Sequence, residues 1–214
     1  MNNVIGLIVA SIYILVIFLT SKLFKKKGKE VTRKYIHIML SNIWFISLAF
    51  FDNFIIAAIL PMLFVIINSL SYKYNLIKIM EREDKKEGIG TVYYAISLTI
   101  LSLVTFYINK PILALPGILI MGYGDGLAAV VGQSIKSKSF NIFGSTKSIA
   151  GSTTMFIVSL IISVLIFAFI GVDYLIGKSI LIAFIATILE AISVKGLDNI
   201  TVPIIITAIV GYII

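Results

Sequence analysis

The 214 residues of this chain are 59% hydrophobic and 13% charged, about half the charged fraction of an ordinary soluble domain. The mean hydropathy is +1.08, and the apolar residues form long runs, which excludes a disordered chain. Cysteine is absent and histidine occurs once, so disulfides, thiolate metal sites, a cysteine nucleophile and a histidine-rich metal site are excluded. The net charge of +8 is explained by basic cytoplasmic loops beside anionic lipid, and we expect no nucleic-acid partner.

The apolar runs, in chain order, predict a polytopic helical bundle. They cover residues 4–21, 36–51, 54–70, 91–108, 112–132, 150–170, 175–194 and 201–214. A membrane-spanning helix needs about 20 residues, so the last run predicts an incomplete or tilted crossing. We therefore expect an all-α integral membrane protein with about seven transmembrane helices plus a short C-terminal eighth, forming a single transmembrane domain over residues 1–214.

Charge decides the predicted orientation. The first run has no basic region before it and a lysine cluster at residues 22–29 after it, the opposite order to a cleaved signal peptide. The loops between the runs fall alternately on the two sides of the membrane. One side carries sixteen of the 18 Lys and Arg residues and the other side carries two. The basic side is therefore predicted to be cytoplasmic and the N-terminus to lie outside. The glycosylation sequon Asn199-Ile200-Thr201 falls on the cytoplasmic side and is expected to be unmodified.

Asp125 is the ionisable residue that stands out in the fifth run. It lies in the sequence Gly122-Tyr123-Gly124-Asp125-Gly126, where glycines allow backbone or ligand to approach closely. The small residues also suit helix packing, but packing does not explain a carboxylate in an apolar segment. Since intramembrane acids are costly, Asp125 is a candidate functional residue.

The polar stretch before the sixth run is rich in Lys and Ser. Residues Lys136, Lys138, Ser145, Lys147, Ser148, Gly151 and Ser152 are its candidate phosphate contacts. Backbone N–H groups and the positive end of a helix dipole at the start of a long helix favour a phosphate. A capped helix start with an interfacial lysine explains the same residues, and spacing alone does not separate the two interpretations.

Two further polar groups lie at the ends of apolar runs. Arg33 and His37, with Lys34, share a helix face at the start of the second run. For each of these residues taken alone, the simpler interpretation is a basic anchor at headgroup depth. Glu87 ends a mixed-charge stretch that is otherwise expected to be solvated surface.

The acidic residues of the last two runs are expected on the same membrane face as Asp125. Glu190 lies near the end of the seventh run, and Asp198-Asn199 follows. Oxygen ligands, lysines and a helix N-terminus at one depth suit Mg²⁺ and a polyphosphate. Helix capping by Asp198 and a buried polar bond of Glu190 are the structural alternatives.

The chain resembles the family of dolichol kinases, phytol kinases and CTP-dependent diacylglycerol kinases. The resemblance rests on five motifs in the family's order: Arg33-Lys34-x-x-His37, Glu87-Gly88-x-Gly90-Thr91-x-Tyr93-Tyr94, Gly124-Asp125-Gly126-x-Ala128-Ala129-x-x-Gly132, Lys147-Ser148-x-Ala150-Gly151-Ser152, and Glu190 with Asp198-Asn199-x-Thr201-x-Pro203. The chain's length resembles that of phytol kinase-like and microbial members.

This resemblance implies a membrane enzyme that phosphorylates a lipid alcohol, such as phytol, a polyprenol, dolichol or diacylglycerol, with CTP as donor and Mg²⁺ as cofactor. It implies catalytic roles for Asp125, Lys147 and Glu190, with Asp125, Glu190 and Asp198 as metal ligands. Lys136, Lys138, Ser145, Lys147, Ser148, Gly151 and Ser152 would contact the nucleotide phosphates. The site would also be lined by Arg33, Lys34, His37, Glu87, Gly124, Gly126 and Asn199.

Two other functions share some of these features. A phosphatidate cytidylyltransferase also uses CTP, Mg²⁺ and a lipid, but its longer Lys/Asp/His-Gly-Gly signature is missing here. A small ion-coupled transporter would use intramembrane acids, but no convincing pair of similar halves is present.

Overall fold

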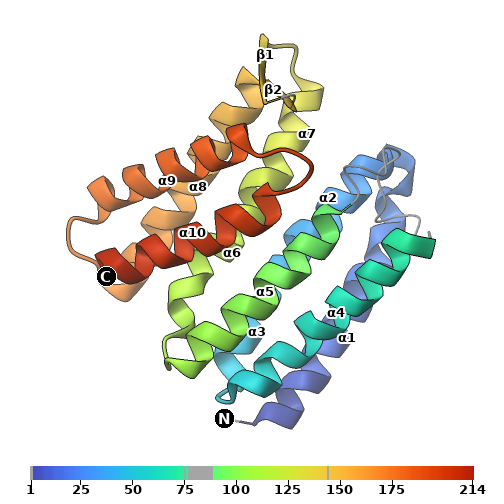
Figure 1. Cartoon of the computed structure of the whole chain (residues 1–214), viewed down its shortest axis with the longest axis vertical. Helices are drawn as coiled ribbons and strands as arrows, with labels where there is room; N and C mark the ends of the chain where they lie inside the picture. The colour runs from blue at the N-terminus through green and yellow to red at the C-terminus, as the bar shows by residue number, and fades with distance from the viewer. Residues whose placement is uncertain (1, 75, 77–88, 144) are drawn as a thin grey trace. The chain divides into compact units, whose positions relative to one another are not determined.

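The computed structural model describes residues 2–74, 76, 89–143 and 145–214. The chain forms two compact units, Met1–Ile112 and Leu113–Ile214. Both units are helical apart from one small hairpin in the second (Figure 1). Among the described residues, six helical segments are long and apolar enough to cross a membrane: Asn3–Lys27, Phe54–Tyr74, Gly90–Tyr107, Pro111–Ser134, Ile149–Ile170 and Leu175–Ile192. The chain is therefore a multi-pass membrane protein.

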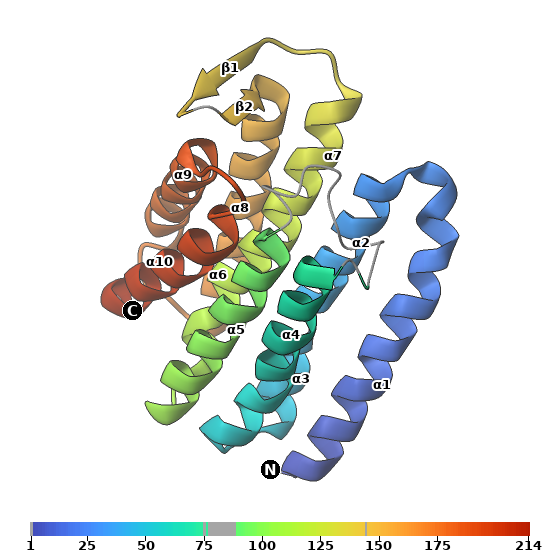
Figure 2. The same cartoon turned by 45° about the vertical axis from the view of Figure 1, so that its right-hand side comes forward.

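The described residues of the first unit form five α-helices and short 3₁₀ turns. Its elements are α1 (Asn3–Ser21), η1 (Lys22–Lys27), α2 (Lys29–Ser41), α3 (Ile43–Phe50), α4 (Phe54–Tyr74), α5 (Gly90–Tyr107) and the start of η3 (Pro111–Ala114). Helices α4 and α5 lie side by side (Figure 2). At one end of this pair the Asn68 side-chain amide donates to the Thr91 carbonyl oxygen at 3.1 Å, and at the other the rings of Phe54 and Tyr107 meet edge to face. The two helices are thus antiparallel.

The predicted span over residues 36–51 is not one continuous helix. It is divided between α2 and α3 at Asn42, whose side-chain amide donates to the Ile38 carbonyl oxygen at 3.3 Å. Such a side-chain bond competes with the backbone ladder of a helix. The described part of the chain thus has six full-length candidate spans where about seven were expected, with the short α10 as the predicted incomplete one.

The second unit begins with a rod of consecutive helical segments. Its elements are α6 (Leu115–Leu119), the π-helical segment η4 (Ile120–Asp125), α7 (Gly126–Ser134), β1 (Ser139–Ile142), β2 (Ser145–Ser148), α8 (Ile149–Ile170), α9 (Leu175–Ile192) and α10 (Asp198–Ile213). Helices α8 and α9 pack together, and α10 packs on α6 and α9. The apolar window of Pro111–Ser134 is 72% buried, the highest share among the candidate spans, so this rod is held within protein rather than facing lipid.

The polar stretch that precedes α8 contains an antiparallel hairpin. Strand β1 pairs with β2 from Ser139 opposite Ser148 to Ile142 opposite Ser145. The all-α prediction is confirmed for the fold as a whole, and this hairpin is a local feature that the prediction did not include. Hydropathy did not reveal the hairpin, because its four-residue strands are short and mostly polar.

A tight connection joins α9 to α10. Lys195 and Gly196 both adopt left-handed backbone angles, with φ of 53° and 79°. Gly196 takes this conformation without a steric penalty, whereas a residue with a Cβ does so at a cost. The turn places the end of α9 close to the start of α10, and each end carries an acidic residue.

Candidate active site

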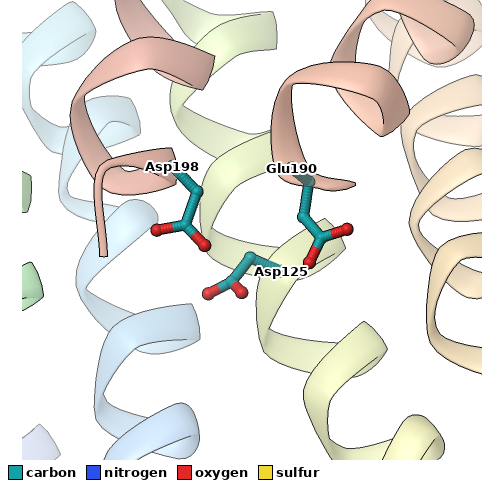
Figure 3. A group of neighbouring side chains, drawn as sticks. All are labelled: Asp125, Glu190 and Asp198. Carbon is teal, nitrogen blue, oxygen red and sulfur yellow. The ribbon is translucent and has the colours of Figure 1, made fainter. Parts of the chain in front are cut away.

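Three carboxylates converge in the second unit. Asp125 ends the π-helical segment η4, Glu190 lies in the last turn of α9, and Asp198 is the first residue of α10. One carboxylate oxygen from each lies within 4.8 Å of the others, and Figure 3 shows the carboxylate groups turned toward a shared space. The residues are only 7%, 5% and 9% exposed. The position of Asp125 at the end of a π-helical turn is of interest because such turns occur frequently at functional sites.

Lys147 supplies a positive charge to this acidic cluster. It lies on β2, and its ammonium group forms a hydrogen-bonded ion pair with Glu190. Burial would lower the pKa of Lys147, but the negative charges of Glu190 and Asp198 outweigh that effect and raise the pKa above its usual value. Lys147 therefore carries a positive charge, and the hairpin holds it beside Glu190.

Asn199 positions Asp198. Its side-chain amide donates to the Asp198 Oδ1 atom at 2.8 Å and to the Gly196 carbonyl oxygen at 3.1 Å. It thus ties the carboxylate to the turn between α9 and α10. The positive end of the α10 dipole also favours a negative charge at Asp198. These bonds hold Asn199 beside Asp198, and the direct lining role that the resemblance implies for Asn199 remains a prediction.

The donor set of this cluster fits a divalent cation such as Mg²⁺. Asp125, Glu190 and Asp198 bring three carboxylate groups together in a buried place, and Lys147 is ion-paired with Glu190. Buried charge is costly unless it is neutralised, and carboxylate oxygens are the ligands that Mg²⁺ and Ca²⁺ prefer. Asp125, Glu190 and Asp198 could hold such an ion.

The start of α8 is capped by protein groups. The N–H of Ile149 donates to the Lys138 carbonyl oxygen, that of Ala150 to Ser137 Oγ, and that of Gly151 to Ser148 Oγ, at 2.9 to 3.1 Å. These are three of the four N–H groups that a helix start leaves without an intrahelical partner. A phosphate bound at these N–H groups would have to displace those bonds. Of the two interpretations that the sequence left open, the structure therefore agrees with the capped helix start.

The remaining predicted phosphate contacts differ in their surroundings. Lys136 and Lys138 are exposed, and Ser145 on β2 is half-buried. The Ser152 hydroxyl is buried and has no hydrogen-bond partner among the described residues. Nucleotide contacts through these four side chains remain a prediction.

Glycines allow the close packing around the cluster. A Cβ at Gly124 would lie 2.7 Å from the Met155 sulfur, and a Cβ at Gly151 would lie 3.1 Å from the Ala128 carbonyl oxygen. These glycines are thus needed where η4 and α7 pack against α8. Gly126 is buried at the junction of η4 and α7. The packing interpretation accounts for Gly124 and Gly151, and their contact with a ligand stays a prediction.

The predicted basic cluster lies in the first unit and is buried. Lys34 is 2% exposed, and the Arg33 guanidinium donates to the Glu30 carboxylate at 2.5 and 3.0 Å. The ring of His37 packs against that of Tyr94, with centroids 4.1 Å apart. The basic anchor at headgroup depth, which the sequence suggested for each residue alone, remains an alternative interpretation. Glu87 lies outside the described residues, and the role of all four in a common site remains a prediction.

Two polar residues of the first unit were not among the predicted site residues. Asn68 on α4 and Tyr94 on α5 are both buried. Asn68 could have been found as a polar residue inside an apolar run. Tyr94 belongs to one of the quoted motifs, but nothing in its sequence context separates it from a packing residue.

The fold and the site together define a class of protein, a multi-pass helical membrane protein with a buried site of carboxylates and one lysine. Within this class, the chain is 32% identical to the phytol kinase of Synechocystis over 91% of its own length and 85% of that protein. The chain belongs to the phytol kinase family, whose members are kinases acting on an alcohol. The family resemblance predicted from the five motifs is confirmed.

Plant relatives match over a smaller share of their length. The probable chloroplastic phytol kinase of Triticum aestivum is 32% identical and phytol kinase 1 of Arabidopsis thaliana 29% identical, each over 82% of this chain. The chain spans 64% of both plant proteins. No protein-family model matches the chain, and no solved structure matches it significantly.

Proposed function

We propose that this chain is a CTP-dependent kinase that phosphorylates the hydroxyl group of an isoprenoid alcohol, phytol or a close analogue. The observation that carries the proposal is the convergence of Asp125, Glu190 and Asp198 with Lys147 in one buried site, in a chain 32% identical to a protein named phytol kinase. CTP as donor follows from the motif resemblance described above.

The reaction transfers one phosphoryl group. A bond forms between the alcohol oxygen and the γ-phosphorus of CTP, and the bond from that phosphorus to the oxygen bridging to the β-phosphate breaks. The products are a lipid monophosphate and CDP, and the alcohol proton passes to a carboxylate of the cluster, for which Asp125 is our candidate. Such a transfer depends on positioning and charge neutralisation more than on a protein nucleophile.

The residues of the cluster divide these tasks. Asp125, Glu190 and Asp198 would hold Mg²⁺, which when bound supplies positive charge to the phosphate oxygens. Lys147 holds Glu190 in place and adds a fixed positive charge beside the phosphates. Asn199 keeps the Asp198 carboxylate oriented, as outer-shell partners of metal ligands commonly do.

The charge asymmetry of the loops supports a cytoplasmic site. CTP would then arrive from the aqueous phase while the alcohol stays in the bilayer with its hydroxyl at the interface. The N-terminus would lie on the opposite side.

The test is label transfer from γ-³²P-CTP to a panel of lipids by the purified protein with Mg²⁺. The panel contains phytol, farnesol, geranylgeraniol, a long polyprenol, diacylglycerol and phosphatidate. We expect labelled phytyl monophosphate and an equal amount of CDP. Labelled pyrophosphate released only with phosphatidate would replace the proposal by a cytidylyltransferase, and inactivity with every lipid would count against both enzymes and for a transporter.

A further inference from the structure

The first unit contains a slender cavity between its helices. It is about 60 Å³ in volume, several times the roughly 10–15 Å³ that one buried water needs. Residues of α1, α2, α3, α4 and α5 line it. On α4 the lining extends from Ala57 to Asn68, a length of about 16 Å at the rise of an α-helix.

Polar groups gather at one end of this cavity. Asn68 and Thr91, joined by a hydrogen bond, mark the end where α4 approaches its C-terminus and α5 begins. Arg33 of α2 also lines the cavity, and His37 stacks on Tyr94 there. From this end the walls continue as mainly apolar side chains, among them Leu40, Trp44, Phe51, Leu60, Phe64 and Leu98.

Tyr94 is the residue that points to a ligand with a hydroxyl group. It lines the cavity and is 4% exposed, yet its hydroxyl has no hydrogen-bond partner among the described residues. Buried polar groups in proteins are nearly always hydrogen-bonded, because an unpaired one costs free energy. A bound molecule with one donor or acceptor at this end would satisfy the Tyr94 hydroxyl.

From this geometry we infer that the cavity of the first unit binds one isoprenoid alcohol, with the hydroxyl at the Tyr94 end and the chain along α4 and α5. This inference rests on the proposed function and names where its lipid substrate is held. We assign one chain to the cavity, and diacylglycerol, with two acyl chains, is the comparison ligand in the test. The polar end lies near the ends of two candidate membrane spans, so the hydroxyl would sit toward the interface and the chain at hydrocarbon depth.

The test is photolabelling with an analogue of phytol that carries a diazirine on its chain and an alkyne handle. The full-length protein is labelled in detergent without nucleotide, and the modified peptides are mapped by mass spectrometry. We expect labels on α2 to α5, displaced by phytol and not by dioleoylglycerol. Labels confined to Leu113–Ile214, or equal displacement by dioleoylglycerol, would overturn the inference.

Matched variants make the test specific to the cavity. Ala95 lines the cavity and is 2% exposed, whereas Val104 on the same helix is 52% exposed and outside it. Ala95→Phe should reduce labelling at least tenfold, because each methylene excluded from an apolar site costs about fourfold in affinity. Val104→Phe should label as the wild type does. Equal labelling of both variants would contradict the assignment.

Tyr94→Phe provides a variant that keeps the shape of the cavity. It should weaken competition by phytol about threefold to tenfold and leave competition by the corresponding hydrocarbon, which has no hydroxyl, unchanged. An unchanged preference for phytol over the hydrocarbon would overturn the role of Tyr94, even if Ala95→Phe fails to fold.

A parallel kinase assay separates this inference from the proposed function. Labelling of the cavity in a protein that phosphorylates none of the lipids would reject the kinase and keep the binding site. Phosphorylation of phytol with an unchanged KM in Ala95→Phe would reject the binding site and keep the kinase.

Discussion

The two units bury opposite charges. Helix α2 of the first unit buries Arg33, Lys34 and His37, whereas the second unit buries Asp125, Glu190 and Asp198. Burying charge is expensive in either case, so neither group is explained by hydropathy. The difference teaches that the two units suit different ligands. The acidic group of the second unit fits a cation and, through the cation, phosphates. The basic helix of the first unit borders an apolar cavity with one polar end.

The largest expected effect comes from removing one charge of the acidic group. Asp125→Asn keeps the size of the side chain but removes the carboxylate. We expect turnover of CTP and phytol to fall about a thousandfold or more, as when a catalytic group that acts in the transition state is removed. The rate of phytyl monophosphate formation measures this.

Asp173→Asn is the matched control for that variant. Asp173 is exposed in the connection between α8 and α9 and should retain full activity. Near-normal turnover in Asp125→Asn, with both variants folded, would remove the acidic cluster from the mechanism.

A smaller effect is expected from the lysine of the cluster. Lys147→Ala leaves Glu190 without its ion-pair partner and removes a positive charge from the cluster, so we expect kcat/KM for CTP to fall about tenfold to a hundredfold. Lys178→Ala, near the opposite end of α9, should have no effect. An unchanged KM and kcat for CTP in Lys147→Ala would count against a role for Lys147 with the nucleotide.

Asn199→Ala separates positioning from direct contact. Loss of the bond to Asp198 Oδ1 should raise the Mg²⁺ concentration for half-maximal activity about tenfold to a hundredfold. Saturating Mg²⁺ should restore most of kcat. A fall in kcat that Mg²⁺ does not restore would show that Asn199 contacts the substrate instead.

The smallest expected effect is structural. Ser148→Ala removes the side-chain cap of α8, which should lower the free energy of unfolding by about 1 kcal/mol and shift the thermal midpoint measured in detergent. Ser139→Ala, on the exposed side of the hairpin, is the control. A large loss of kcat/KM for CTP without loss of stability would instead support Ser148 as a phosphate contact.

Hydropathy predicted the long helices well because a bilayer demands about 20 apolar residues for each crossing. It failed at Asn42, since one polar residue inside an apolar run does not reveal whether its side chain competes for backbone carbonyls. It also missed the π-helical turn that ends at Asp125, because hydropathy does not distinguish helix types.

The acidic cluster was foreseen in part. The alternation of spans put Asp125, Glu190 and Asp198 on one membrane face, but their approach to within 4.8 Å depends on packing and on the left-handed turn at Lys195 and Gly196. The ion pair of Lys147 with Glu190 joins residues 43 positions apart, and the hairpin that carries Lys147 has almost no signal in the sequence.

The most direct measurement of the central claim is transfer of label from γ-³²P-CTP to phytol by the purified protein, first stripped of metal with EDTA and then titrated with Mg²⁺. We predict no labelled lipid in EDTA, labelled phytyl monophosphate with equimolar CDP as Mg²⁺ is restored, and no recovery in Asp125→Asn at any Mg²⁺ concentration. Full activity in EDTA, or a wild-type response from Asp125→Asn, would contradict the account.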